Sequence, residues 1–458
     1  MKIIICGAGQ VGRGIAERLS GEGNDVTVID LSPQLVQSLS DSLDVQGIVG
    51  HGAHPDVLER AGARSADMII AVTFIDEINM VACQVAHAIF SIPTRIARVR
   101  DQSYLLAEYR ALFSSDHTAI DVVISPELAV GDMVLRRLEL PGAFETIYFA
   151  EERIVAMGIA LRDDCPVVDT PLEQLTELFP DLNAVVVGLV RDNNLMVPHG
   201  ADQMQSGDLV YVIAERSQAT RALGLFGHEE RPARRVLIGG GGNIGRYVAH
   251  KLEERDRSMR VRIIEANRER AEVIAEDLKG SIVLHGSVLD QQILREAGIG
   301  QTEAYVALTN DDKVNVLSAV LAKQEGALHS MALVSGLDVG QLAGPLGVDS
   351  FIDPRSVTVS SILRYVRRGR IRGVHPVRNG EAEVVEAEAL ETSPLIGKPL
   401  RDAELPDGIR LGAVVRDDKV FIPDGSTEIR PHDRVIVFAL RDQVKEIQHR
   451  FRVSMEYF

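Results

Sequence analysis

Three glycines near the start of the chain have the spacing of a phosphate-binding turn. The stretch "MKIIICGAGQVGRGIAERL" places Gly7, Gly9 and Gly12 in the pattern G-x-G-x-x-G, between an apolar strand and a helix that begins near Val11. The first glycine permits a tight turn, the second lets a pyrophosphate approach the backbone, and the third lets helix and strand pack closely. Free N–H groups at the start of such a helix attract anions. The spacing therefore predicts a site for the phosphates of a nucleotide, the alternative being a turn kept only for helix packing.

A carboxylate follows the glycines at the sequence separation that is typical of a ribose-binding residue. The stretch "NDVTVID" reads as a second strand that ends in Asp30, about 20 residues after the glycines. A carboxylate in this place can accept hydrogen bonds from both ribose hydroxyls, and it would repel a 2′-phosphate. The sequence thus favours NAD or a plain adenine nucleotide over NADP.

The whole pattern occurs a second time. The stretch "RRVLIGGGGNIGRYVAHKLEE" (234–254) repeats the glycine turn, and Glu265 ends the following strand as the counterpart of Asp30. In both copies, apolar strands alternate with helical patterns of about 10–15 residues, which is typical of a parallel, doubly wound sheet. We therefore expect two Rossmann-like domains, the second with its turn at Gly240, Gly242 and Gly245.

The segments between the two copies are also paired. Residues 187–214 match residues 412–439, and both contain short β-rich runs punctuated by turns. They predict a small α+β domain after each Rossmann-like domain. The fold class is α/β, and the expected domains are residues 1–124, 125–232, 233–352 and 353–458.

Polar residues at the ends of later strands are further ligand candidates. Thr73 and Thr309 occupy matching places after the fourth strand of each copy, whereas Asp76 and Asp312 are expected to cap the next helix. Arg98 closes the fifth strand of the first copy, where its guanidinium could pair with a phosphate or form a salt bridge between subunits.

The third strands end in a loop that would meet an adenine ring. This loop contains His51 and Gly52 in the first copy and His285 and Gly286 in the second. We expect the glycines to allow close approach of the ring, and the histidines to contact the base edge or to pack, in preference to transferring protons.

Composition and charge exclude several classes of protein. The 458 residues carry a formal charge of −17, so a polyanion such as nucleic acid would be repelled. The basic stretch at 364–373 is expected to be a solvated helix end, or else a docking surface for an acidic partner or a membrane face. The three cysteines have no C-x-x-C spacing, so we expect neither disulfides nor a zinc site. Without a signal peptide or an apolar run of about 18 residues, the protein is expected to be cytoplasmic.

The small domains lack a convincing catalytic group. His199 lies in a predicted turn, and its repeat partner is Asp424, so that position is not kept between the copies. No Ser-His-Asp order and no H-E-x-x-H motif occurs in the sequence. These observations favour a nucleotide sensor. The alternative is an NAD-dependent oxidoreductase with a duplicated Rossmann fold, and a redox sensor that binds nucleic acid would need a DNA-binding module that the sequence does not show.

Five stretches are specific enough to indicate a family: "MKIIICGAGQVG", "IVGHGAHPDVLERAGA" (48–63), "TFIDEINMVACQVA" (73–86), "VLIGGGGNIG" (236–245) and "ALTNDDKVNVLSAVLAK" (307–323). Through them, and over its full length, the sequence resembles the TrkA family, the cytoplasmic regulatory subunits of bacterial Trk potassium-uptake systems. Each half resembles an RCK (KTN) unit, a Rossmann-like domain followed by a small carboxyl-terminal domain. The resemblance implies a protein that is not an enzyme, that binds NAD(H), with ATP or ADP as further ligands, and that contains no bound metal.

The resemblance also implies partners and site residues. The chain would form a homo-oligomer, expected to be a tetramer, beneath a membrane potassium-translocating subunit of the TrkH/TrkG type on the inner membrane. The implied first site contains Gly7, Ala8, Gly9, Gln10, Val11, Gly12, Asp30, Gly52, Ala53, Thr73, Phe74 and Arg98, and the second contains Gly240, Gly242, Asn243, Ile244, Gly245, Glu265, Ser287 and Thr309. Two departures from the family pattern stand out: the loop "GHGAH" lacks the acidic residue of many relatives, and "MALVSGLD" has no arginine in the place of Arg98. The second site is therefore expected to be weaker or to prefer another nucleotide.

Overall fold

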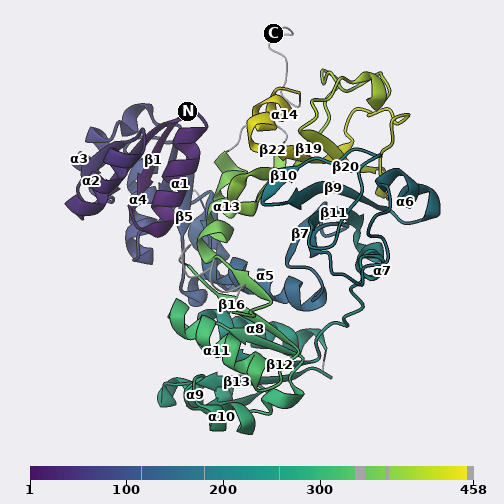
Figure 1. The fold of residues 1–458 in the computed structure, drawn as a ribbon. Coiled ribbons are helices and arrows are strands. Elements are labelled where there is room, and N and C mark those ends of the chain that lie inside the picture. Colours follow the sequence, from purple (N-terminus) through teal and green to yellow (C-terminus); the bar gives the residue numbers. More distant parts are fainter. Residues whose placement is uncertain (115, 180, 257, 336–345, 367–370, 451–458) are drawn as a thin grey trace. The chain divides into compact units, whose positions relative to one another are not determined.

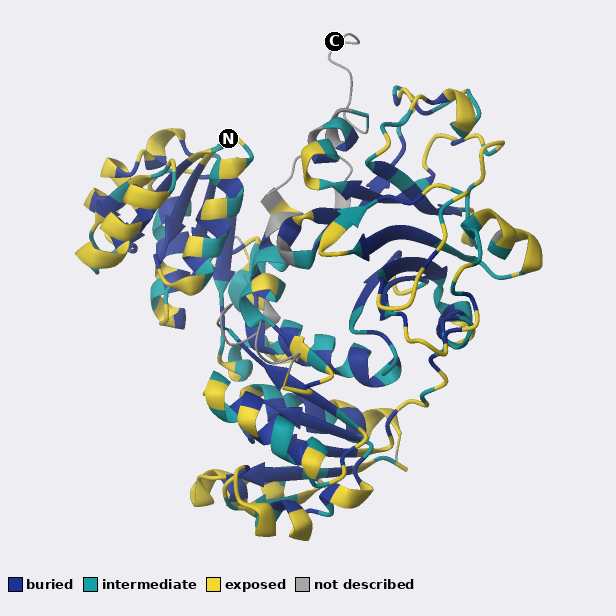
Figure 2. Cartoon of the chain, in the orientation of Figure 1, coloured by how far each residue is buried: buried dark blue, intermediate teal, exposed yellow. Residues whose placement is uncertain are grey.

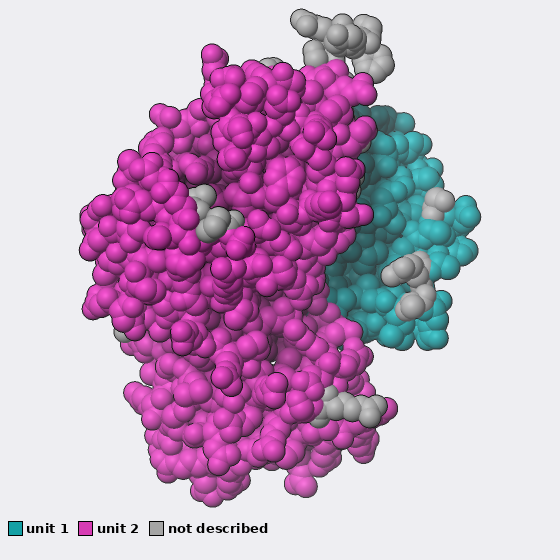
Figure 3. Space-filling view, turned by 90° about the vertical axis from the view of Figure 1, so that its right-hand side faces the viewer, with its two compact units in different colours: residues 1–131, 334–336, 352–363 teal, residues 132–333, 337–351, 364–458 magenta. Residues whose placement is uncertain are grey.

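A computed structural model describes the chain except for residues 115, 180, 257, 336–345, 367–370 and 451–458. The chain divides into two compact units, coloured separately in Figure 3. The first unit comprises residues 1–131, 334–336 and 352–363, and the second comprises residues 132–333, 337–351 and 364–458. Figure 1 shows the helices and strands, coloured along the chain from the N-terminus to the C-terminus.

The first α/β domain contains a six-stranded parallel sheet in the order β3-β2-β1-β4-β5-β6. Four of the five residues of β1 are buried, as expected for a central strand covered on both faces. Helix α1 buries Gly12, Ile15, Ala16 and Leu19, a spacing that turns one face to the sheet. The strands are β1 (Lys2–Cys6), β2 (Asp25–Asp30), β3 (Gln46–Val49), β4 (Met68–Ala71), β5 (Thr94–Arg98) and β6 (Val122–Ile124), and the helices are α1 (Gln10–Gly21), α2 (Pro33–Ser42), α3 (Pro55–Arg60) and α4 (Asp76–Ala88).

An antiparallel sheet follows, in the order β10-β9-β11-β8-β7. The buried Asp208 accepts two hydrogen bonds from the Arg191 guanidinium and one from the backbone N–H of Gln205, and this fixes the turn before β11. The elements are α5 (Pro126–Glu139), β7 (Glu145–Phe149), β8 (Ile154–Ala160), α6 (Leu172–Leu178), β9 (Ala184–Arg191), β10 (Asn194–Met196), β11 (Leu209–Glu215) and α7 (Ala219–Leu225).

The second half repeats the parallel sheet, in the order β14-β13-β12-β15-β16-β17. Strands β14, β13, β12, β15 and β16 pair in parallel, in the same sequence of crossovers as in the first sheet. The elements are β12 (Arg235–Gly239), α8 (Asn243–Arg255), β13 (Arg260–Glu265), α9 (Arg268–Asp277), β14 (Ile282–His285), α10 (Gln291–Glu296), β15 (Ala304–Ala307), α11 (Asp312–Gln324), β16 (His329–Leu333) and β17 (Ser350–Ile352).

The chain ends with a second antiparallel sheet, in the order β18-β19-β22-β20-β21. Arg416 and Asp433 repeat the pair formed by Arg191 and Asp208, again with two hydrogen bonds. The elements are α13 (Pro354–Val366), β18 (Ile371–Val377), β19 (Ala382–Glu388), β20 (Ile409–Arg416), β21 (Lys419–Phe421), β22 (Arg434–Leu440) and α14 (Val444–Arg450).

The two antiparallel sheets share one hydrophobic core within the second unit. Val187 and Ile213 of the first sheet belong to the same buried cluster as Ile436 and Phe438 of the second. A Cβ on Gly188 would lie 2.7 Å from the Phe438 ring, so the absence of a side chain there makes room for the partner sheet. The central strands of the sheets are buried, and the outer helix faces are exposed (Figure 2). The expectation of two Rossmann-like domains, each followed by a small α+β domain, is confirmed.

Candidate nucleotide-binding site

The first glycine turn has the geometry that phosphate binding requires. Gly7 has φ +114°, and Gly12 packs so closely that a Cβ would lie 1.8 Å from the Gly7 carbonyl oxygen. A Cβ on Gly9, by contrast, would meet no atom within 4 Å. Among the described residues, no side chain caps the start of α1 at Gly9. The turn therefore leaves open space beside the first backbone N–H groups of the helix, where an anion is favoured.

Asp30 lies beside this turn at the end of β2. One carboxylate oxygen accepts from the Ala8 backbone N–H at 2.7 Å, and the other accepts from the Ser32 N–H at 2.8 Å. Because a carboxylate can accept about four hydrogen bonds, each oxygen retains capacity for one more donor. Two neighbouring hydroxyls of a ribose would match this capacity.

A buried asparagine holds the ends of β4 and β5 together. Asn79 is 0% exposed, and its Oδ1 accepts from the Thr73 N–H at 2.8 Å and from the Thr73 hydroxyl at 2.7 Å. Its Nδ2 donates to the carbonyl oxygens of Thr73 and Arg98, at 3.2 and 3.0 Å. The Thr73 hydroxyl proton is therefore used within the protein, and Asn79 serves to position the strand ends.

The Arg98 side chain is a half-buried cation without a partner. Within the described part of the chain it makes no hydrogen bond or ion pair, and its Nε is buried. Burial lowers the pKa of the Arg98 guanidinium, whereas the negative charge of Glu127 acts in the opposite direction. An unpaired guanidinium in such surroundings would gain free energy from a bound anion.

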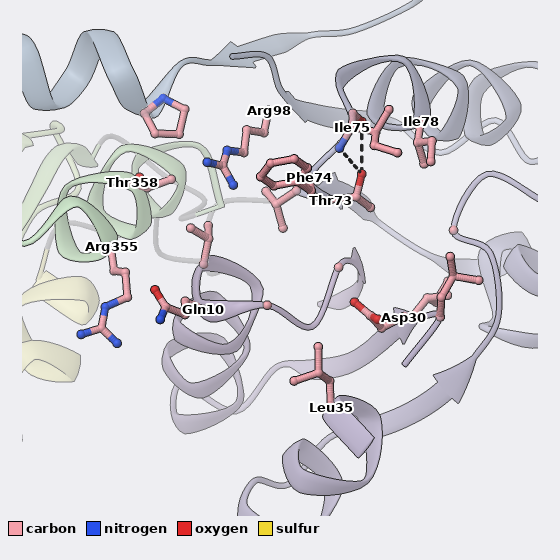
Figure 4. A pocket seen from close by; sticks show the side chains of 18 of the residues that line it. Gln10, Asp30, Leu35, Thr73, Phe74, Ile75, Ile78, Arg98, Arg355 and Thr358 are labelled. Carbon is pink, nitrogen blue, oxygen red and sulfur yellow. Dashed lines mark hydrogen bonds between the residues drawn. The ribbon is translucent and has the colours of Figure 1, made fainter. Parts of the chain in front are cut away.

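These groups line one pocket of about 590 Å³, a volume suited to a nucleotide. Figure 4 shows Asp30 and Leu35 at one end and Arg355 and Thr358 at the other, with Gln10 and Arg98 between them. Of the residues predicted for the first site, the lining contains Gly7, Gly9, Gln10, Val11, Asp30, Gly52, Thr73, Phe74 and Arg98. Ala8, Gly12 and Ala53 are buried behind it, where Ala8 holds Asp30 and Gly12 packs on Gly7.

The pocket also contains residues that were not predicted from the sequence. Apolar side chains near Asp30 were not predicted, although their place directly after the strand end was a usable signal. The lining residues from position 126 onward had no such signal, because only folding of the chain brings them close to the glycine turn. The unpredicted lining comprises Ile29, Leu31, Leu35, Gly50, Val72, Ile75, Ile78, Pro126, Ser335, Pro354, Arg355 and Thr358.

The capping roles expected for Asp76 and Asp312 are wrong. Asp76 accepts from the backbone N–H groups of Arg100 and Asp101, at 2.8 and 2.9 Å, so its carboxylate ties the loop after β5. In the second copy the residue that caps α11 is Asp311, which accepts from Lys313 and Val314. The prediction failed for Asp76 because the backbone after β5 binds its side chain. It failed for Asp312 because the capping residue of α11 is the preceding one.

The role of the loop glycines in admitting an adenine ring stays a prediction, and the structure adds a packing reason for both glycines. A Cβ on Gly52 would lie 2.9 Å from the Cβ of Cys6, and one on Gly286 would lie 2.8 Å from Ile293. Packing against these side chains therefore already excludes a larger residue. His51 lines the pocket and stacks on His54 with ring centroids 4.4 Å apart, whereas His285 is exposed at the end of β14.

The second glycine turn has the same backbone but different surroundings. Gly240 has φ +106°, a Cβ on Gly245 would lie 2.0 Å from the Gly240 oxygen, and Gly242 faces open space. Asn243 and Ile244 begin α8. Leu333 lies in the place of Arg98, because Asn315 donates to its carbonyl oxygen as Asn79 does to that of Arg98.

The carboxylate of the second turn is more heavily engaged than that of Asp30. Glu265 accepts from the N–H groups of Gly241 and Asn267, and its Oε1 also accepts from Arg270 at 3.0 Å. These hydrogen bonds outweigh burial and lower the pKa of Glu265. Of the remaining predicted residues, Thr309 is bonded to Asn315, and the Ser287 hydroxyl accepts from the Leu289 N–H.

The described residues include neither a candidate metal site nor a candidate membrane-spanning helix. The three cysteines are buried and free. Among the residues whose placement is described, no group of His, Cys, Asp and Glu is arranged to hold a metal ion. Over the same residues, no helix has both the length and the apolar character needed to cross a bilayer. Residues 367–370 of the basic stretch lie outside the described residues.

Comparison with known proteins identifies first the class and then the family. Along 98% of this chain and 94% of the other, the fold matches the "GsuK RCK domain" with a TM-score of 0.60 at 17% identity. A structure described as "GsuK channel bound to NAD" matches with a TM-score of 0.61 at 16% identity, over 98% of this chain and 78% of the other. The fold is therefore that of a tandem RCK protein.

Sequence comparison resolves the family. The TrkA-N domain family matches residues 3–126 and 236–354, and the TrkA-C domain family matches residues 156–227 and 384–452. The Trk system potassium uptake protein TrkA of Azorhizobium caulinodans is 55% identical over the full length of both chains. The chain belongs to the TrkA family of potassium-uptake proteins.

Proposed function

We propose that this chain is a nucleotide-sensing regulatory subunit that gates a membrane potassium-uptake protein of the TrkH/TrkG type. The observation that carries the proposal is the unpartnered Arg98 guanidinium, which faces the same pocket as the glycine turn and Asp30. A pocket with a phosphate turn, a ribose acceptor and an unpaired cation is complementary to NAD(H), ATP or ADP.

Each residue has a definite task in this proposal. The N–H groups at the start of α1 bind phosphate, with Gly9 leaving room for it. Asp30 accepts from the ribose hydroxyls, and Leu31, Leu35 and His51 flank the adenine. Arg98 contributes a charge-assisted hydrogen bond to phosphate.

The same pocket supports sensing in preference to catalysis. Its lining has no histidine or carboxylate beyond His51 and Asp30 among the described residues, and both have tasks in nucleotide binding. A ligand shifts an assembly between states by its differential affinity for them, and this needs no acid–base group. Support comes from the potassium-uptake name of the 55%-identical relative and from the NAD bound to the GsuK channel of similar fold.

We place the protein at the cytoplasmic face of the inner membrane, as a homo-oligomer that we expect to be a tetramer. The proposed domains remain residues 1–124, 125–232, 233–352 and 353–458. The second turn is the weaker site in this proposal, because Leu333 replaces the arginine and Arg270 already binds Glu265.

A matched pair of variants tests the binding function. Gly9 has φ −65° and ψ −174° and Gly242 has φ −68° and ψ −172°, so an aspartate fits either backbone without strain, yet it places an anion where phosphate should bind. Calorimetric titration with NADH, ATP and ADP should show that Gly9→Asp abolishes binding to the first site and that Gly242→Asp preserves it. Unchanged binding by Gly9→Asp would reject the proposed site, and consumption of bound NADH with a carbonyl substrate would favour the oxidoreductase.

A further inference from the structure

One wall of the first pocket comes from the second half of the chain. Pro354, Arg355 and Thr358 belong to α13, which follows the second parallel sheet in the sequence, yet they line the pocket of the first α/β domain. Residues 352–363 form part of the same compact unit as residues 1–131. The pocket is therefore built from both halves of the chain.

Tight packing holds this segment in place. A Cβ on Gly14 of α1 would lie 3.1 Å from the Val359 side chain, so the two helices are in close contact. Thr358 and Ile362 are fully buried on the same helix, and the Val334 N–H donates to the Ile352 oxygen just before it. The position of Arg355 on the pocket wall is thus set by a packed element.

Two nitrogens of the Arg355 guanidinium remain available to bind an anion, because the ion pair with Asp353 uses only Nε. Its Nε makes a long contact of 3.4 Å with Asp353, and within the described part of the chain its two terminal nitrogens have no hydrogen bond. The first half does not repeat this arrangement. There, the corresponding helix α5 begins with Pro126 and Glu127, and Glu127 already pairs with Arg100 at 2.7 Å.

The order of groups along the pocket indicates which part of a ligand would meet Arg355. A nucleotide with its ribose on Asp30 and its first phosphates at Gly9 extends toward Arg98, and Figure 4 shows Arg355 at the end opposite Asp30. The Arg98 guanidinium on the way and the two unbonded terminal nitrogens of Arg355 at the far end favour further phosphate over an uncharged group. In NAD, the groups beyond the pyrophosphate are a ribose and nicotinamide, which carry no negative charge.

We propose that Arg355 is a specificity-determining residue that binds the terminal phosphate of a nucleoside triphosphate in the first pocket. This proposal rests on the proposed function of that pocket. It has a consequence for the whole chain: ATP would link the first α/β domain to the helix that follows the second, whereas NAD would leave that link unmade.

The test is calorimetric titration of the full-length protein with ATP, ADP and NAD. Arg355→Gln should weaken ATP binding about tenfold or more, weaken ADP binding less, and change NAD binding by less than about twofold. Arg355→Lys keeps a charge and should restore part of the ATP affinity. Arg268→Gln removes an arginine that is 78% exposed on α9 and should change none of the three affinities.

Hydrogen exchange supplies an independent readout. ATP should slow exchange of the backbone N–H groups of residues 355–362 in the unaltered protein but not in Arg355→Gln. Equal ATP affinity and equal protection in Arg355→Gln, while Arg98→Gln still weakens binding, would overturn this inference and leave the proposed function standing. Failure of the unaltered protein to bind any of the three nucleotides would overturn both.

Discussion

The two glycine turns differ in one nearby residue, which is Arg98 in the first copy and Leu333 in the second. Both lie at the end of the fifth strand of their sheets, where a buried asparagine bonds to their carbonyl oxygens. Leu333 is buried as an ordinary apolar residue, whereas Arg98 keeps an unpartnered, desolvated guanidinium. A charge in such surroundings lowers the stability of the empty protein, and a bound anion would offset that cost.

This contrast predicts opposite effects of Arg98→Leu on binding and on stability. Nucleotide affinity should fall about 10- to 100-fold, because a charge-assisted hydrogen bond of about 1.5–3 kcal/mol is lost. The melting temperature of the empty protein should stay the same or rise. Titration and calorimetric melting measure the two effects. A lower melting temperature with unchanged affinity would favour the alternative in which Arg98 pairs with a neighbouring subunit.

Asp30 and Glu265 provide a second matched pair. Asp30→Ala should weaken NADH or ATP binding by about 1–3 kcal/mol, because ribose hydroxyls lose their acceptor. Glu265→Ala removes a carboxylate that Arg270 already engages, and it should leave the first-site affinity unchanged. Titration of both variants decides the point, and equal affinities for Asp30→Ala and the unaltered protein would show that Asp30 does not bind ribose.

At the scale of elements, the asparagines of α4 and α11 join neighbouring strands. Asn79 connects the ends of β4 and β5, and Asn315 connects β15 and β16 through the same four kinds of hydrogen bond. Each side chain is fully buried. The strand ends that carry Thr73 and Arg98 are thereby held at fixed positions on the pocket.

Replacing either asparagine by alanine should destabilise its own domain by about 2–4 kcal/mol, since several buried polar groups lose partners. Native-state hydrogen exchange should show the loss at β4 and β5 in Asn79→Ala and at β15 and β16 in Asn315→Ala. Only Asn79→Ala should also weaken nucleotide binding to the first pocket. Equal binding in both variants would mean that the asparagine does not position the site.

Local patterns predicted the elements well and the pocket in part. Each glycine turn and its carboxylate, Asp30 or Glu265, lie within about 25 residues of each other, so the spacing was visible in the sequence. Arg355 lies far along the chain from Gly9, and only the packing of α13 on α1 brings it to the pocket. The capping prediction for Asp76 failed for a related reason, because its carboxylate binds the backbone after the next strand.

At the scale of the whole molecule, duplication buries a sheet face that each half would expose. The shared core contains Val187 and Ile213 from one sheet and Ile436 and Phe438 from the other. A chain of residues 1–232 alone should therefore self-associate through this face. Analytical ultracentrifugation should report a dimer, and Ile213→Asp in that fragment should prevent its formation. A stable monomer would show that the face needs no partner.

The central claim is that nucleotide in the first pocket changes potassium flux through a membrane partner. A coupling of about 1–3 kcal/mol would alter partner affinity or open probability by about 5- to 150-fold. The direct measurement is potassium flux in liposomes that contain a TrkH-type protein, with and without this chain, as NADH, ATP and ADP are varied. We predict flux that depends on both the chain and the nucleotide, and a loss of nucleotide dependence in Gly9→Asp. Flux that ignores the chain and its ligands, together with failure to co-purify with such a partner, would contradict the account.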